Sequence, residues 1–401
     1  SDASVRAPRG LVALLATLSA VGPFAVDAYL PALAAIGADL GVSALSVQQT
    51  LTAYMVPFAL MSLWHGALSD AWGRRSVILW GTALFLAASV ACAVARSLEA
   101  LLVFRALQGM TAGAGMVVGR ALIRDLYDGA VAQRAMAQVS LMFALAPALA
   151  PVIGGWVLDA FGWRAVFGFL IVFSAGTWAW CLRALPETLP PERRQPLHAA
   201  YLLRAYTTVL LSGPFMLVCA VITLMFSGFF IYVMAAPVFL MEHLGVPATG
   251  FLWLFGPATL GIAGGSYVSG RTAGKMTLRR TLAWAFGLMG VAAASNLTLH
   301  LARPPSLPWS VAPLFVYSLG MSLAFPVLTL RALDLFPEQR GLAASCQSFV
   351  QTLGAAANAL LAPLVWDTTV SLALTQTALL GLALVGLAVP VRPPPPPPPP
   401  A

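Results

Sequence analysis

The chain has 401 residues, of which 60% are hydrophobic and only 9% are charged. Soluble globular domains have about a quarter of their residues charged, so this composition excludes an ordinary soluble protein. The formal net charge of +8 arises from 22 basic and 14 acidic residues. Four cysteines occur without CxxC spacing, which argues against a disulfide framework and against a metal site.

Long apolar runs fill the chain and predict membrane-spanning helices. A run of roughly 20 apolar residues crosses a hydrocarbon core about 30 Å thick as an α-helix. Barrel strands would alternate apolar and polar residues, whereas runs such as Ala83-Leu-Phe-Leu-Ala-Ala-Ser-Val-Ala do not alternate. We therefore expect an all-α membrane protein with twelve transmembrane helices. The expected spans lie near residues 11–33, 45–68, 76–95, 99–121, 136–160, 165–185, 212–237, 248–269, 281–301, 310–331, 342–365 and 369–390.

The basic residues predict the orientation of these spans, because Lys and Arg concentrate in loops that remain in the cytoplasm. With the N-terminus inside, most basic residues fall at the inner surface, and only Arg96, Arg164 and Arg303 fall outside. We therefore expect both termini to be cytoplasmic. The net charge then reflects topology and contact with the lipid bilayer, and we expect no nucleic acid partner.

A polar, proline-bearing linker over residues 186–211 divides six expected spans from six. The segment Tyr267-Val-Ser-Gly-Arg271-Thr-Ala-Gly274-Lys275 weakly repeats a segment about 200 residues earlier, at 66–75. This repeat predicts two six-helix bundles around a central cavity, one over 1–185 and one over 212–391. Residues 392–401 are nearly all proline, and we expect a disordered or non-native tail there.

Charged and small residues interrupt the apolar spans of the first half in distinctive patterns. The first span contains Val26-Asp27-Ala-Tyr29-Leu30-Pro31, and Gly66-Ala-Leu-Ser-Asp70-Ala-Trp-Gly73-Arg74-Arg75 joins the second and third spans. The fourth span holds Leu102-Val-Phe-Arg105-Ala-Leu-Gln108-Gly109, and Arg120-Ala-Leu-Ile-Arg124-Asp125-Leu-Tyr127 follows it. The fifth span contains Ala146-Pro147-Ala-Leu-Ala150-Pro151-Val-Ile-Gly154-Gly155, and Gly162-Trp163-Arg164-Ala-Val-Phe167 comes next.

These patterns resemble those of the major facilitator superfamily, and in particular its twelve-helix drug:proton antiporters of the bicyclomycin and chloramphenicol exporter type. The resemblance is strong over residues 20–188 and diffuse afterwards. It departs from the family at Ala150, where glycine is usual, and at His65, where an apolar or aromatic residue is commoner. The resemblance implies the major facilitator fold, a bacterial-type inner membrane, and coupling between a proton and a substrate.

Asp27 is the acidic residue that we place well inside a span, where an ionisable group costs roughly 2.5–3.5 kcal/mol. Burial disfavours the charged carboxylate, so this group can take up a proton from one side of the membrane and release it when a substrate arrives. Arg105 has no acidic neighbour in its own helix, and Asp27 is the available carboxylate across the bundle. We expect Arg105 to set the proton affinity of Asp27, directly or through water and Gln108.

Two alternatives stay open for these residues. The Asp27 carboxyl could serve only as a hydrogen-bonding group toward a neighbouring helix. Arg105 could equally be a structural arginine that bonds backbone carbonyls. The four histidines lie near expected helix ends or in loops, so none of them is favoured as a proton relay.

The inner loops contain a predicted conformational latch, since Asp70 and Arg74 can bond helix ends on the inner face and stabilise one state of the transport cycle. Arg134 and Asp125 are its candidate partners. The predicted latch residues are Gly66, Asp70, Gly73, Arg74, Arg75 and Arg134. Helix bending and close packing are expected in the fifth span at Pro147, Pro151, Gly154 and Gly155.

A pocket for drugs needs apolar and aromatic walls with a few polar groups. Three amides spaced i, i+4 and i+11 share one face of the eleventh span, so they should line the cavity or, alternatively, form a hydrogen-bond ladder between helices. The candidate substrate-binding residues are Asp27, Tyr29, Tyr54, Met55, Phe58, Gln108, Met116, Phe143, Phe226, Phe230, Tyr232, Gln347, Gln351 and Asn358.

The sequence thus predicts a monomeric secondary transporter that exports hydrophobic or amphipathic small molecules in exchange for protons. No phosphate-cradling loop, metal site or catalytic constellation is visible, so we expect neither an enzyme nor a cofactor. One alternative is a proton-coupled transporter of a single metabolite, such as a nucleoside, sugar or siderophore. A membrane receptor or uncoupled channel is the other, and the buried acid argues against it.

Overall fold

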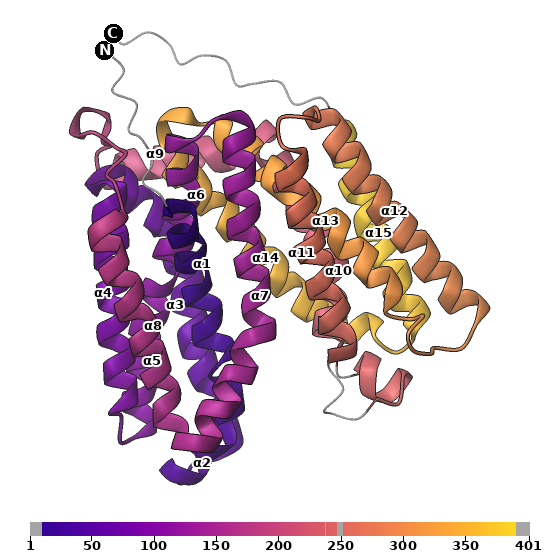
Figure 1. Cartoon of the computed structure of the whole chain (residues 1–401), viewed down its shortest axis with the longest axis horizontal. Helices are drawn as coiled ribbons and strands as arrows, with labels where there is room; N and C mark the ends of the chain where they lie inside the picture. The colour runs from indigo at the N-terminus through magenta and orange to yellow at the C-terminus, as the bar shows by residue number, and fades with distance from the viewer. Residues whose placement is uncertain (1–9, 237, 247–251, 390–401) are drawn as a thin grey trace. The chain divides into compact units, whose positions relative to one another are not determined.

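The computed structural model describes residues 10–236, 238–246 and 252–389, and every regular element in these ranges is a helix (Figure 1). The expected proline tail and the first nine residues lie outside the described residues. The helices of the first half are α1 (Leu11–Asp27), η1 (Leu30–Ala32), α2 (Leu33–Leu40), α3 (Ala44–Trp72), α4 (Arg74–Ala93), α5 (Leu98–Ala112), α6 (Ala114–Leu126), α7 (Gly129–Phe161), α8 (Trp163–Ala184) and η2 (Pro191–Arg193). Those that follow are α9 (Ala199–Leu210), α10 (Gly213–Met234), η3 (Val238–His243), α11 (Leu252–Thr272), α12 (Leu278–Ala302), α13 (Ala312–Asp334), η5 (Pro337–Gln339), α14 (Arg340–Val365) and α15 (Thr369–Ala388).

Among the described residues, nine helical segments are long and apolar enough to cross a membrane. Two of them join consecutive helices, at Leu11–Leu40 and at Leu98–Leu126. The expected spans near 136–160, 248–269 and 342–365 correspond to α7, α11 and α14. A helix bonds its own backbone N–H and C=O groups internally, which is what a chain in hydrocarbon requires. The prediction of an all-α membrane protein is confirmed.

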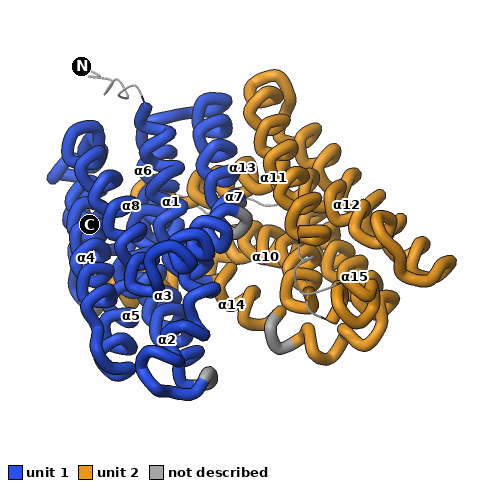
Figure 2. The backbone as a smooth tube through the Cα atoms, turned by 60° about the horizontal axis from the view of Figure 1, so that its bottom comes forward, with its two compact units in different colours: residues 1–198, 339–349 blue, residues 199–338, 350–401 orange. Residues whose placement is uncertain are grey.

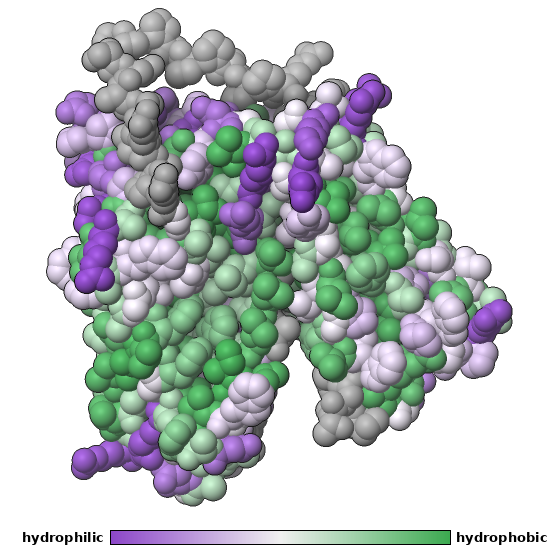
Figure 3. All heavy atoms as spheres, in the orientation of Figure 1, coloured by the Kyte–Doolittle hydropathy of each residue, from purple (hydrophilic) through white to green (hydrophobic). Residues whose placement is uncertain are grey.

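Large apolar side chains stand exposed on the flanks of these helices. Trp80 is 69% exposed, Trp156 70% and Phe161 79%. In the view of Figure 3, green hydrophobic side chains cover the middle of the helices, and purple polar ones gather toward their ends. Exposed apolar surface of this extent is expected where lipid, rather than water, surrounds a protein.

The chain divides into two compact units (Figure 2). Unit 1 comprises residues 1–198 and 339–349, and unit 2 comprises residues 199–338 and 350–401. The boundary at 198 falls inside the linker that the sequence predicts. The first turns of α14 belong to unit 1, although the rest of this helix belongs to unit 2.

In unit 1, α1 packs on α7, α3 on α5, and α4 on both α5 and α8. Two of its transmembrane segments are interrupted, one after Asp27 and one at Gly113, which separates α5 from α6. Gly73 alone joins α3 to α4, with φ +97°. A residue with a side chain rarely adopts this angle, so a glycine is needed at the junction.

In unit 2, α11 packs closely on α13. A Cβ atom on Gly265 would overlap the Leu319 carbonyl, so glycine is what permits this approach. The segment 267–275, which weakly repeats 66–75, makes an exposed contact: Arg271 donates to the Tyr267 hydroxyl (3.0 Å). The second copy of the motif therefore does not reproduce the buried contacts of the first.

Gly154 and Gly155 are adjacent in α7 but have different surroundings. A Cβ on Gly154 would overlap the carbonyl of Ala28, the residue after Asp27, whereas a Cβ on Gly155 would meet nothing within 4 Å. Gly154 thus brings α7 against the end of α1. The side chain of Pro147 lies outside the described residues, and α7 continues as one helix through Pro151.

Gly154→Ala is expected to destabilise the protein by about 1–3 kcal/mol, because the added methyl group forces α7 away from α1. Gly155→Ala is the matched control, and it should leave stability unchanged or raise it by up to about 1 kcal/mol through helix propensity. Thermal unfolding in detergent measures both variants. Equal melting temperatures for the two would contradict the close contact at Gly154.

Candidate functional site

Asp27 is the last residue of α1, where the first transmembrane segment breaks. The chain then enters η1, which contains Pro31 and so lacks one backbone donor. The Asp27 side chain is half-buried. It lies at the C-terminal end of α1, where the helix dipole is negative. Broken transmembrane helices commonly carry the ion and substrate sites of transporters.

Arg105 lies on α5 and is fully buried. Its guanidinium sits between the rings of Tyr29 and Tyr54, 4.4 Å from each ring centroid. Its Nη1 donates to the carbonyl of Ala25 (3.1 Å) and to Gln108 Oε1 (2.6 Å). Two aromatic faces and two neutral oxygens therefore stabilise this cation.

Arg105 and Asp27 form no ion pair in the part of the chain that the structure describes, so of the two routes expected from the sequence, direct contact and contact through water and Gln108, the direct one is not formed in this structure. The bond to Ala25 matches the alternative of an arginine bound to backbone carbonyls. The Tyr54 hydroxyl donates to the Gly22 carbonyl (3.1 Å).

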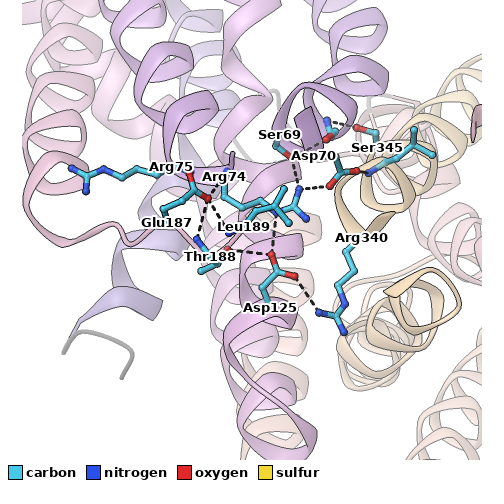
Figure 4. A network of polar contacts seen from close by, with 12 residues as sticks. Ser69, Asp70, Arg74, Arg75, Asp125, Glu187, Thr188, Leu189, Arg340 and Ser345 are labelled. Atoms are coloured by element: carbon cyan, nitrogen blue, oxygen red, sulfur yellow. Dashed lines mark hydrogen bonds and ion pairs between the residues drawn. The ribbon is translucent and has the colours of Figure 1, made fainter. Parts of the chain in front are cut away.

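Arg74 is the centre of a second polar site, at the junction of α3 and α4 (Figure 4). Its side chain is 2% exposed, its Nη1 donates to Asp70, and its Nε donates to Asp125 Oδ2 (3.0 Å). Arg340 pairs with the other oxygen of Asp125 (3.1 Å). Glu187 accepts the backbone N–H of Arg74 (2.9 Å). We call Asp70, Arg74, Asp125, Glu187 and Arg340 the arginine network.

The arginine network also binds the start of α14. Asp70 Oδ2 accepts the backbone N–H of Leu342 (2.8 Å), and the N–H of Gly66 donates to Ser345 Oγ (2.7 Å). A Cβ on Gly66 would overlap the carbonyl of Gly341, so a glycine at both positions lets α3 and α14 touch. An aspartate beside the first turn of a helix is stabilised by the free N–H groups there.

Among the expected latch residues, Asp70 and Arg74 meet in the arginine network, and Asp125 is the partner of Arg74. Arg134, the other candidate partner, lies on an exposed part of α7. Arg75 points away from the network, since its Nη2 donates to the Leu182 carbonyl (2.9 Å) at the end of α8.

The candidate substrate-binding residues differ in how deeply their side chains are buried. Tyr29, Tyr54 and Tyr232 are buried, and each uses its hydroxyl within its own unit: Tyr29 with Thr50 (2.7 Å), Tyr54 with Gly22, and Tyr232 with Asn296 (2.6 Å). Met55 and Phe143 are 52% and 39% exposed. The half-buried members are Phe58, Met116, Phe226 and Phe230.

The three amides of α14 also differ from one another. Asn358 is buried and donates to Ser227 Oγ on α10 (2.8 Å), as the hydrogen-bond ladder would require. Gln347 is buried and Gln351 is half-buried. The structure thus favours the ladder at Asn358.

Sequence reasoning missed several residues of the arginine network. Glu187 and Arg340 had no role assigned, because they lie far from Arg74 in sequence. Ser345 was also missed, because a serine five residues into a helix gives no signal by itself. His65, expected near a helix end, is 4% exposed within α3, beside the break at Gly113.

The sequence profile of the Major Facilitator Superfamily matches residues 15–359. The chain belongs to this superfamily. It is 33% identical over 317 residues to the uncharacterized MFS-type transporter YdgK of Bacillus subtilis (strain 168), covering 78% of this chain and 79% of that one. The multidrug resistance protein D of Escherichia coli (strain K12) is 29% identical, with 86% of each chain covered. The bicyclomycin resistance protein homolog of Haemophilus influenzae is 28% identical, with 91% and 92% covered.

Among solved structures, that of the human organic anion transporter MFSD10 matches with a TM-score of 0.75 at 20% identity, covering 94% of this chain and 99% of that one. At this identity the match shows the fold. The protein is therefore a multi-pass membrane transporter with the major facilitator fold, and the predicted resemblance to the drug exporters of this superfamily is confirmed.

Arg74→Lys is expected to lower stability by about 1–3 kcal/mol, because one ammonium group keeps the charge but cannot bond Asp70 and Asp125 together at a buried site. Arg75→Lys is the matched control, since a lysine can still donate to a single carbonyl. Thermal unfolding of both variants in detergent provides the measurement. A stability loss of the same size in the two would show that the carboxylates do not depend on Arg74.

Proposed function

We propose that this transporter exports hydrophobic or amphipathic small molecules across a bacterial-type inner membrane in exchange for protons. The observation that carries this proposal is the half-buried Asp27 carboxyl at the broken end of α1. The relatives named for resistance to several drugs or to bicyclomycin support drugs as the substrate class. The protein works as a single chain by alternating access, with both termini in the cytoplasm.

Asp27 carries the proton. When the site opens to the acidic outer side, the carboxylate takes up a proton, which the α1 dipole and partial burial favour. When the site opens inward, the arriving substrate displaces the proton into the cytoplasm. Met55 and Phe143, the exposed members of the candidate substrate-binding set, contact the apolar part of the substrate in this proposal.

Arg105 sets the proton affinity of Asp27 through space. Its charge has no carboxylate partner in the described chain, so its field is not cancelled locally. The field favours the deprotonated form of Asp27 and opposes the effects of burial and the helix dipole. Because these influences oppose each other, the Asp27 carboxyl can both take up and release a proton. The arginine network acts as the latch that stabilises one state of the cycle.

The proposal predicts that several unrelated drugs release protons from purified, detergent-solubilised wild-type protein, and that Asp27→Asn abolishes this release. The amide is nearly the same size but cannot exchange a proton. Asp39→Asn is the matched control, since Asp39 pairs with Arg164 in an exposed position, and it should release protons normally. Release by none of the compounds would contradict drug–proton exchange, and release by one metabolite alone would indicate a specific transporter.

Coupling between Asp27 and Arg105 predicts non-additive effects in a double-mutant cycle of drug export. Arg105→Ala should slow export, and adding it to Asp27→Glu, which keeps an exchangeable carboxyl and measurable export, should cost little more than Asp27→Glu alone, because the second residue acts through the first. The measurement is the initial rate of export from cells or vesicles. Additive effects of the two substitutions would contradict coupling between Asp27 and Arg105.

A further inference from the structure

The linker after α8 contacts the first turn of α4 through one carboxylate. Glu187 Oε1 accepts the backbone N–H groups of Arg74 (2.9 Å), Thr188 (3.0 Å) and Leu189 (3.0 Å). Its Oε2 accepts the N–H of Arg75 (3.2 Å). The first N–H groups of a helix have no partner within the helix, and a carboxylate there also complements the positive end of the dipole. Glu187 therefore caps α4 from a segment more than a hundred positions away in the sequence.

The space for this carboxylate exists because residue 73 is a glycine. A Cβ on Gly73 would overlap Glu187 Oε2 and would lie 2.9 Å from Arg194 Nη2. Gly73 thus has two functions, since it adopts φ +97° at the junction of α3 and α4 and it admits the capping carboxylate. The Glu187 side chain is 29% exposed, so the cap is shielded from water on most sides.

The same linker contacts the arginine network at two further points. The Thr188 hydroxyl donates to Asp125 Oδ2 (3.2 Å), the oxygen that also accepts from Arg74 Nε. The backbone N–H of Gln195 donates to the carbonyl of Asp70 (2.9 Å). The linker therefore touches both carboxylate residues that hold the Arg74 side chain.

We propose that Glu187 is a positioning residue of the latch. By fixing the first turn of α4, it keeps the Arg74 guanidinium between Asp70 and Asp125, and it thereby keeps Asp70 aligned with the first turn of α14. The linker between the two halves is then a working part of the latch. The role in transport rests on the proposed function of the arginine network, whereas the positional coupling is tested independently.

A cap that merely stabilises α4 would have a different effect from a positioning residue. The informative group is the backbone N–H of Leu342, in the first turn of α14, which donates to Asp70 and does not touch Glu187. Local capping affects only the amides that Glu187 itself bonds, which are those of Arg74, Arg75, Thr188 and Leu189. Positioning through Arg74 and Asp70 affects the amide of Leu342 as well.

The experiment is hydrogen–deuterium exchange of the full chain in lipid nanodiscs, comparing wild type with Glu187→Ala and Glu187→Gln. We expect exchange to accelerate about tenfold in the first turn of α4 and also at Leu342, since each bond to a charged group is lost. Glu187→Gln keeps the side-chain size, so it serves if the alanine variant fails to fold. Glu192→Gln, in the same linker but exposed, is the matched control and should exchange as wild type. Acceleration confined to the amides that Glu187 bonds, or none at all, would overturn the proposal.

Drug export in vesicles separates this inference from the proposed latch. Glu187→Ala and Arg74→Ala should each lower the turnover several-fold with little change in KM, and the double variant should be no slower than Arg74→Ala alone. A slow Arg74→Ala with a normal Glu187→Ala would overturn the role of Glu187. If Arg74→Ala itself exports normally, the latch function fails, and the exchange at Leu342 still decides whether Glu187 positions the network.

Discussion

A buried guanidinium must be stabilised by the groups around it, and at Arg74 this requirement joins several helix ends of unit 1. Removing one partner from a buried ion pair leaves an uncompensated charge, which costs several kcal/mol. Arg74 meets the requirement with Asp70 from α3 and Asp125 from α6, and Arg340 balances the second charge of Asp125. Two acids and two arginines thus neutralise each other where several helices end. The positions of these helix ends are interdependent, because each of them supplies a group that another one needs.

Arg105 meets the same requirement differently. It is as deeply buried as Arg74, but neutral oxygens and two tyrosine rings surround it. A carboxylate in contact with Arg105 would be held in its charged form and could not exchange a proton easily. An Asp27 that is not paired with Arg105 therefore suits the proposed proton carrier better than a direct pair would. The two arginines thus show two ways of stabilising a buried charge, one with carboxylates and one with neutral oxygens and aromatic rings.

Hydrophobic patterning predicted most of the fold, because in lipid nearly every long apolar segment must be a helix. The sequence offered Arg134 and Asp125 as candidate partners of Asp70 and Arg74, and the structure pairs Arg74 with Asp125. Local sequence could not predict the contact of Glu187 with α4 or of Ser345 with α3, since each contact joins two segments that are far apart along the chain. The difference between Gly154 and Gly155 was also hidden, because it depends on which face of α7 meets Ala28. The break at Gly113 and the burial of His65 likewise depend on packing between helices.

The most direct test of the central claim uses the protein reconstituted in liposomes with an imposed pH gradient and no membrane potential. The account predicts that a drug moves uphill, against its concentration gradient, when protons flow in the opposite direction. Reversing the pH gradient should reverse the drug flux, and Asp27→Asn should abolish both. Drug movement that is only downhill and independent of the pH gradient would contradict proton-coupled export.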